Sequence, residues 1–444
     1  MNKCQVTATS LDDAGHGVGT AEGTRVHVTD LLPGERAEVA IDHTSPHKPE
    51  AWGRIVRRLG APSADRTEPA CPAFGRCGGC LWQHLTYPAQ LVAKRARVVA
   101  ALGDDAAVAN VRPSPQLLGY RNKGKYVVGR SGNGVNDPVV LGAYAPRSHH
   151  VIDTIGCRVV APIIDEIATW VRGATERAQL VPYEEAKRAG ELRYVVIREA
   201  AGDVMIALIV TPGTPRAKLE HVANAMSKHP AVRGLVAITN DRRDGAIVPS
   251  GSSAHVLFGH GHLVEEIAGV KLEVGAAEFL QVNRAQAHAM YTRVAELAGD
   301  MHGKRAVDLF AGLGGFGLHL ARAGAEVVAV EIDRDAVAQL RRAAERAGLP
   351  LTTIAGDAGV ELAERLGKPD LVVVNPPRKG LSDSTRDLLA ALAPPTIIYV
   401  SCGPESLGRD LAILRRHGWT PDTIEPFDLM PGTAQIETIV RLRR

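Results

Sequence analysis

The stretch Asp308-Leu-Phe310-Ala-Gly312-Leu-Gly314-Gly315-Phe-Gly317 decides the fold of the C-terminal part of the chain. It opens a series in which strand, glycine turn and helix alternate. The apolar runs AVDLF, EVVAVEI, DLVVVN and TIIYVS are continuous, as is typical of parallel strands buried on both faces. Helical stretches such as RDAVAQLRRAAERAG separate these runs. We therefore predict a doubly wound, Rossmann-like α/β domain over residues 285–444.

The same turn predicts a cofactor site. Gly312, Gly314 and Gly317 match the G-x-G-x-x-G pattern, and Glu331 closes the next strand nineteen residues after Gly312. A carboxylate at that place accepts hydrogen bonds from ribose hydroxyls. The pattern serves dinucleotides and S-adenosylmethionine alike, so it does not by itself decide between them.

The run Asn375-Pro-Pro-Arg-Lys-Gly380 after the fourth strand favours S-adenosylmethionine. Two prolines after a strand end make a rigid turn that can hold a planar base beside a methyl donor. Asp357, after the third strand, suits the adenine end of that cofactor. Enzymes that methylate exocyclic amines carry an aromatic residue after the prolines, so Arg378 argues against amino-group methylation. A plain structural turn is the alternative interpretation.

Two further residues form a candidate catalytic pair. Cys402 follows the apolar run IIYVS, and Glu437 stands in GTAQIETIV. Carbon 5 of a pyrimidine becomes nucleophilic only after a thiolate adds to carbon 6. A base must then remove the proton from carbon 5 before the thiolate can leave. Taken alone, each residue has an ordinary structural reading, but beside the glycine turn we interpret Cys402 as nucleophile and Glu437 as base.

Four cysteines stand in an arrangement that binds iron and sulfur. CPAFGRCGGC places Cys71, Cys77 and Cys80 in a C-x5-C-x2-C pattern, and Cys157 follows in DTIGC. The glycines of the first segment let the backbone fold around a cluster. We predict a 4Fe–4S cluster on these four residues. A structural zinc site is the alternative, although zinc prefers paired short spacings.

The chain of 444 residues is long enough for two or three domains. Residues 1–62 show near period-two alternation with frequent glycine, which predicts a small β-barrel. Residues 63–284 begin with a Pro- and Ser-rich linker and the cysteine arm, and continue as a mixed α/β region. Residues 285–444 complete the chain as the Rossmann-like domain.

Charge and hydropathy limit the partners. The net charge is only +3, but residues 90–160 carry ten Lys or Arg against four Asp, a stretch that suits a phosphate backbone. A solvated basic face is the open alternative. No signal-peptide pattern is visible, and runs such as MIALIV are too short to span a bilayer. We expect a soluble cytoplasmic protein with no membrane partner.

With these motifs the chain resembles the RNA 5-methyluridine methyltransferases of the uridine-C5 class over essentially its whole length. Residues 1–60 resemble the TRAM domain, an RNA-binding OB-like barrel. The arm CPAFGRCGGCLWQH with Cys157 resembles the family's 4Fe–4S site, and Tyr120-Arg-Asn-Lys123 is also similar. Phe279-Leu-Gln281-Val-Asn283 resembles the stretch that meets the cofactor and the target base.

The resemblance implies S-adenosylmethionine-dependent methylation of uridine carbon 5 in RNA, with Cys402 as nucleophile and Glu437 as base. It implies a monomer, and 23S ribosomal RNA is favoured over transfer RNA as the substrate. Two positions depart from the family pattern: Asn375 stands where many members have Asp, and Gln435 where His is frequent. The cofactor contacts expected from the resemblance and the motifs are Gln281, Phe310, Gly312, Gly314, Glu331, Asp357 and Asn375.

Other classes explain fewer of these residues. Radical methylthiotransferases also join TRAM domains to clusters, but their C-x3-C-x2-C triplet leaves one iron open, whereas four cysteines would close every position. A catalytically silent RNA-binding protein leaves Cys402 and Glu437 unexplained. A dehydrogenase explains neither the NPPR nor the SCGP motif.

Overall fold

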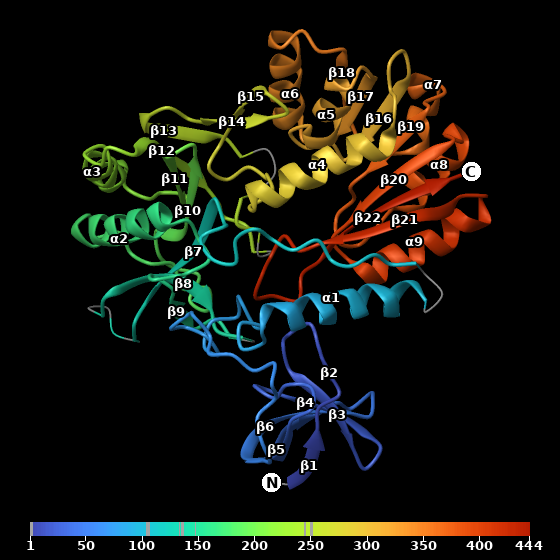
Figure 1. Ribbon diagram of the computed structural model, residues 1–444. Helices are drawn as coiled ribbons and strands as arrows, with labels where there is room; N and C mark the ends of the chain where they lie inside the picture. Colours follow the sequence, from blue (N-terminus) through green and yellow to red (C-terminus); the bar gives the residue numbers. More distant parts are fainter. Residues whose placement is uncertain are drawn as a thin grey trace.

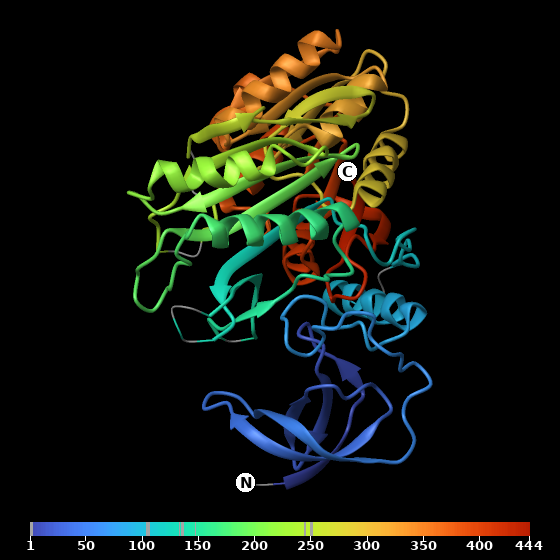
Figure 2. The same ribbon diagram turned by 90° about the vertical axis from the view of Figure 1, so that its left-hand side faces the viewer.

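The computed structural model describes residues 3–103, 107–132, 134, 137–146, 148–243, 246–248 and 252–444. Three larger sheets follow one another along the chain (Figure 1). Both views place the N-terminal sheet beneath helix α1, apart from the two seven-stranded sheets (Figures 1 and 2).

The N-terminal sheet has six strands in the order β1-β5-β6-β4-β3-β2. Alternate side chains such as Val6, Val26 and Val39 form its small core, as the period-two pattern predicts. Gly19 of β3 must be glycine because a Cβ there would lie 2.2 Å from the carbonyl oxygen of Thr7. The strands are β1 (Lys3–Thr7), β2 (Ser10–Leu11), β3 (Gly17–Ala21), β4 (Thr24–Val28), β5 (Arg36–Thr44) and β6 (Glu50–Leu59).

Helix α1 (Tyr87–Leu102) connects the cysteine arm to the C-terminal sheet. Its buried residues Val98 and Leu102 share a core with the C-terminal strands and with helix α9 (Pro404–Arg416). The two helices approach so closely that a Cβ on Gly408 would lie 2.2 Å from the carbonyl oxygen of Ala101. The sequence patterns do not predict helix α1. The helix packs against residues that lie far from it in the sequence.

The central sheet has seven strands in the order β13-β12-β11-β10-β7-β8-β9, and among these only β11 and β12 pair in parallel. Helices α2 (Pro162–Arg177) and α3 (Arg216–Met226) supply the core of one face. The predicted mixed α/β character of this region is confirmed. Its strands are β7 (Lys123–Arg130), β8 (Val139–Tyr144), β9 (Val151–Asp153), β10 (Leu192–Ala200), β11 (Asp203–Val210), β12 (Val232–Thr239) and β13 (Ala254–Gly259).

The C-terminal sheet has the order β18-β17-β16-β19-β20-β22-β21, and β16 to β20 are parallel. From β16 the chain continues to β17 on one side and later to β19 on the other side. A crevice is therefore expected at the carboxyl ends of these strands. The Rossmann-like prediction is confirmed. The strands are β16 (Arg305–Leu309), β17 (Glu326–Glu331), β18 (Leu351–Ala355), β19 (Leu371–Val374), β20 (Thr396–Ser401), β21 (Thr420–Phe427) and β22 (Glu437–Arg443).

Helices cover both faces of this sheet. One face packs against α4, α5, α6 and the hairpin β14–β15, and the other against α1, α8 and α9. Successive residues of β16 point to opposite cores, Ala306 to the first and Val307 to the second. The remaining elements are β14 (Leu263–Ile267), β15 (Val270–Val274), α4 (Arg284–Ala298), α5 (Gly315–Arg322), α6 (Arg334–Arg346), η1 (Val360–Leu362), α7 (Ala363–Leu366) and α8 (Asp383–Leu392).

Candidate active site

A cavity of about 740 Å³ lies where the carboxyl ends of β16, β17 and β19 face the central sheet. Met205, Val236 and Ile238 of the central sheet line its opposite wall, which the sequence motifs do not reveal. The structure brings six of the seven predicted cofactor residues into the lining: Gln281, Phe310, Gly312, Glu331, Asp357 and Asn375. The roles of these six residues stay predictions. That they line one cavity is an observation of the structure, independent of the glycine motif.

The carboxylate of Glu331 is held in place by backbone amides. Gly312 donates its N–H to Oε2 at 2.8 Å, and Asp333 donates to Oε1 at 2.9 Å. Each carboxylate oxygen has a second lone pair, so the group can still accept hydrogen bonds from a ligand. The predicted ribose acceptor is thus oriented before any ligand arrives.

Residues of the glycine turn adopt left-handed backbone conformations. Gly314, the seventh predicted residue, precedes α5 with a φ of 81°, and a Cβ there would lie 2.4 Å from Leu340. Phe310 also has a positive φ, 64°, although it is not glycine. Such strain costs of order 1–3 kcal/mol and concentrates at functional sites.

Asp308 stabilises this turn from beneath. It is fully buried in β16, and its Oδ2 accepts the N–H of Gly317 at 2.8 Å. Burial raises the pKa of Asp308 to about 7, against the lowering effect of that hydrogen bond. The sequence analysis quotes Asp308 without giving it a role. Asp308 is the only acidic residue of the apolar strand β16, and this position is the sequence signal that indicates a role.

Phe279 lies on the loop that carries Gln281 and lines the same cavity with 72% of its surface exposed. A phenylalanine so exposed is unusual, since burial of its ring contributes to folding. The loop is fixed from below by two buried basic side chains, because Lys123 and Arg198 both donate to the carbonyl oxygen of Glu278. The exposed ring is therefore carried by a loop that contacts within the protein hold in place.

Cys402 and Glu437 meet because their strands are neighbours. Strands β20 and β22 pair antiparallel with Ser401 opposite Thr438, so the residues just beyond this pair, Cys402 and Glu437, lie at the same end. Arg378 follows β19 at that end and donates to the side-chain oxygen of Gln435 at 2.6 Å. The structure thus brings the predicted nucleophile and base together, adjacent to the turn that carries Asn375.

The electrostatics of this pair suit proton transfer. Burial raises the pKa of Glu437 to about 8, while Arg378 lowers it. Burial and then the Glu437 carboxylate raise the pKa of Cys402, while Arg378 lowers it. Arg378 therefore stabilises both anions, although in the sequence it argued only against amine methylation.

A second cavity, of about 150 Å³, is lined by Cys71, Cys77, Cys80 and Cys157. Burial raises the pKa of Cys77, and raises the pKa of Cys80 to about 11. Gathering four thiols in one small cavity matches the four-thiolate ligand set of an iron–sulfur cluster. The residues present therefore fit the predicted cluster, and the same set would also fit zinc.

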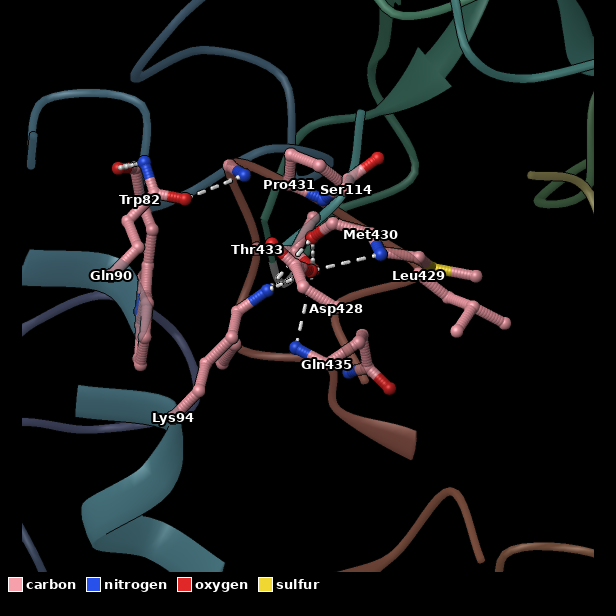
Figure 3. A network of polar contacts seen from close by, with 12 residues as sticks. Trp82, Gln90, Lys94, Ser114, Asp428, Leu429, Met430, Pro431, Thr433 and Gln435 are labelled. Atoms are coloured by element: carbon pink, nitrogen blue, oxygen red, sulfur yellow. Dashed lines mark hydrogen bonds and ion pairs between the residues drawn. The ribbon is translucent and has the colours of Figure 1, made fainter. Parts of the chain in front are cut away.

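A third group of residues was missed by sequence reasoning. Lys94 of α1 and Asp428 after β21 form an ion pair at 2.6 Å, with both side chains fully buried (Figure 3). The polar network around them joins α1 to the residues that precede Glu437. No sequence pattern near Lys94 or Asp428 indicates that the two residues form an ion pair, because 334 positions separate them.

The sheet order, the glycine turn and the cavity define the class of fold, which is a Rossmann-like domain with a ligand-sized cavity. The chain is 32% identical over 447 residues to an RNA methyltransferase of Clostridium tetani, covering 97% of this chain and 94% of that protein. It is 33% identical over 451 residues to an RNA methyltransferase of Geobacter sulfurreducens, covering 99% and 89%. The protein belongs to this RNA methyltransferase family.

Two further comparisons also gave matches. Residues 288–415 match the family described as conserved hypothetical protein 95. The fold resembles the crystal structure of the Pyrococcus abyssi tRNA (uracil-54, C5)-methyltransferase in complex with S-adenosyl-L-homocysteine, with a TM-score of 0.76. That match covers 99% of this chain and 100% of the other at 23% identity. Among the described residues, no helix is long and apolar enough to cross a membrane.

Proposed function

We propose that this protein methylates carbon 5 of a uridine in RNA, with S-adenosylmethionine as methyl donor. The observation that carries the proposal is the meeting of Cys402 and Glu437 at the ends of paired strands. An RNA methyltransferase acting on an amine or a ribose needs no thiol beside a buried carboxyl group. The fold shared with a uracil-C5 enzyme supports the same reaction.

The residues divide the work as follows. The thiolate of Cys402 adds to carbon 6 of the uracil, which places negative charge on the ring and makes carbon 5 nucleophilic. When bound, S-adenosylmethionine would supply a methyl group to carbon 5 and would leave as S-adenosylhomocysteine. Glu437 then removes the proton from carbon 5, and the carbon–sulfur bond breaks to return the thiolate. Arg378 stabilises the two anions, and Phe279 offers a stacking surface for the base.

The donor site is proposed at the 740 Å³ cavity. Glu331 would accept the ribose hydroxyls, and Asp357 the adenine amino group. Gln281, Phe310, Gly312 and Asn375 would surround the remainder of the cofactor, and Gly314 would shape the turn. The four cysteines would hold a 4Fe–4S cluster with a structural role, since no ligand position remains for a substrate. A protein purified anaerobically should be brown with about four irons per chain, and a colourless zinc protein would contradict this.

For the RNA, we propose 23S ribosomal RNA rather than transfer RNA, with residues 1–62 as a TRAM domain that contacts it. The decisive experiment measures tritium released from carbon-5-labelled uridine in transcripts of 23S ribosomal RNA and of tRNA. Release that needs S-adenosylmethionine and Cys402 supports the proposal. Methyl transfer into RNA without tritium release would place the methyl group elsewhere on the nucleotide and refute it. A modification map of a deletion strain then identifies the uridine.

A further inference from the structure

The loop of residues 428–435 lies between β21 and β22 and ends two positions before Glu437, the first residue of β22. Figure 3 shows Asp428 and Gln435 of this loop beside Lys94 of α1. We call it the base-bearing loop. It has no regular secondary structure of its own, so its shape depends on the contacts made to it. Those contacts come chiefly from segments more than 140 positions earlier in the chain.

Lys94 fixes the start of the base-bearing loop. Its Nζ donates to Oδ1 of Asp428 at 2.6 Å and to the carbonyl oxygen of Met430 at 3.1 Å. Burial lowers the pKa of Lys94, and the Asp428 carboxylate raises it. Replacing such a pair by apolar residues is often neutral for stability, so a buried pair is better explained by the geometry it imposes than by stability.

Gln90, one turn earlier on α1, fixes the middle of the loop. Its Oε1 accepts the N–H of Gly432 at 2.8 Å, and its Nε2 donates to the carbonyl oxygens of Trp82 and Leu85. Trp82 in turn donates its N–H to the carbonyl oxygen of Gly432 at 2.8 Å. The N–H of Gly432 is therefore bound by α1, and its carbonyl oxygen by Trp82, two residues after Cys80.

Gly432 also lies beside the cysteine arm. Its φ is 77°, and a Cβ there would lie 3.0 Å from the side chain of Gln83 and 3.7 Å from Cβ of Cys80. The backbone N–H of Cys71 is bound by the same Gln83 at 3.1 Å. A change at the cysteines thus reaches the loop through one layer of side chains.

The other side of the loop rests on the start of α4. Asn283 donates to the carbonyl oxygen of Leu429 at 3.1 Å, and Gln286 donates to that of Asp428 at 2.9 Å. At its exit, Gln435 accepts from Arg378, which faces both Cys402 and Glu437. The loop is therefore held along its length and ends at the reacting groups.

We propose that Gln90 and Lys94 are positioning residues that set the approach of Glu437 to carbon 5, and so couple the cysteine arm to proton removal. This inference rests on the proposed function. It extends that function because it gives the cysteine site a role in the second half of the reaction, through contacts rather than through electron transfer.

The test compares Gln90→Met with Arg95→Met, a control on the same helix whose side chain binds the carbonyl oxygen of Val108 instead of the loop. Two rates are measured with the full-length protein. Covalent adduct formed with 5-fluorouridine RNA reports addition and methyl transfer, and tritium release from carbon-5-labelled RNA reports proton removal. We expect Gln90→Met to lower tritium release at least tenfold and adduct formation less than threefold, while Arg95→Met changes neither.

The pH profile separates positioning from general damage. The charged or titratable groups that face Glu437 are Cys402, Arg378 and Tyr291. Loosening the loop admits water to Glu437, so the midpoint of tritium release should move below the wild-type value in Gln90→Met. An unchanged midpoint, or equal loss of adduct and tritium release, would overturn the inference.

Two further outcomes are distinguished by the design. If the wild-type protein forms no adduct and releases no tritium with either RNA, the proposed function fails and the inference falls with it. If the wild type is active and Gln90→Met releases tritium at the wild-type rate, only the inference fails. Should Gln90→Met unfold, Lys94→Met paired with Asp428→Leu tests the same loop, because the double change leaves no unpaired buried charge.

Discussion

The glycine turn and the base-bearing loop stand at the same edge of one sheet, yet they are held in opposite ways. The turn is fixed by partners close in sequence: Asp308 binds Gly317 nine positions away, and Glu331 binds Gly312 nineteen away. The loop is fixed by Gln90 and Lys94, at separations of 342 and 334 positions. The glycine turn is therefore fixed by local contacts, whereas the base-bearing loop takes its shape only once distant segments have packed against it.

The difference predicts how each half fails. A change in the turn should affect cofactor binding while the rest of the site persists. A change around the loop should leave cofactor binding intact and disturb the chemistry or the stability of the whole assembly. The experiments below are ordered from the largest expected effect to the smallest.

Replacing Cys402 by Ala should abolish methylation to below detection, because addition to carbon 6 cannot begin. No covalent protein–RNA species should form, even with 5-fluorouridine at the target. Denaturing electrophoresis of protein with labelled RNA measures the adduct. Cys4→Ala, at a free cysteine of the N-terminal sheet, is the matched control and should retain activity. An adduct in Cys402→Ala would assign the nucleophile elsewhere.

Replacing Glu437 by Gln should slow turnover about 10²–10⁴-fold, the usual contribution of a general base. Addition and methyl transfer do not need this base, so a methylated RNA–protein adduct should accumulate through Cys402. The measurement is a band shift that requires both the cofactor and Cys402. Normal turnover without an adduct would remove Glu437 from the mechanism.

Replacing Lys94 by Met should lower the free energy of unfolding by about 3–5 kcal/mol, because the buried carboxylate of Asp428 loses its partner. Urea denaturation measures the change. Lys368→Met, at an exposed lysine, should leave the midpoint unchanged. A loss below about 1 kcal/mol in Lys94→Met would mean that water reaches the pair, and the contrast between the two halves would weaken.

Replacing Glu331 by Ala should weaken S-adenosylmethionine binding without unfolding the protein. Each charge-assisted hydrogen bond to the ribose is worth about 1.5–3 kcal/mol, so the dissociation constant should rise at least tenfold by calorimetry. Glu326→Ala, at the exposed start of the same strand, is the control. Equal affinity in Glu331→Ala and wild type would place the ribose contact on another residue.

The smallest effect, counted per pH unit, concerns pH and stability. The pKa of Glu437 is raised by burial from 4.5 to about 8, so between these values the folded state binds a proton that the unfolded state releases. Stability should therefore fall as pH rises through this window, by at most about 1.4 kcal/mol per pH unit from this group. Asp308, with a pKa of about 7, adds to the same slope below pH 7. Glu437→Gln should show a shallower slope, and an unchanged slope would contradict the burial of its charge.

The sequence predicted the parts of the molecule that local chemistry specifies. Continuous apolar runs indicated the parallel strands, and the spacing from Gly312 to Glu331 indicated two residues that do share one cavity. Cys402 and Glu437 could be placed at strand ends from their flanking runs. Cys402 and Glu437 are neighbours, however, because β22 inserts between β20 and β21. No local sequence pattern shows this strand order.

Other features could not be predicted because their cause is tertiary. Helix α1 has no side-chain cap and joins a core made largely by residues more than 200 positions later, so its pattern alone does not reveal its place. The wall of the cavity formed by Met205 and Ile238 consists of ordinary buried residues that acquire a role only by position. Lys94 looks in sequence like part of a basic, solvated stretch, but it is fully buried.

The order of strands at the end of the sheet also bears on protein synthesis. Strand β22 lies between β20 and β21, but the ribosome makes it after both. A nascent chain can therefore complete its cysteine arm, its glycine turn and even the strand before Cys402 while the gap for β22 is still open. Glu437 enters when that gap closes. Glu437 therefore joins Cys402 only after β20 and β21 have been translated, so a chain that stops before β22 lacks the proposed base.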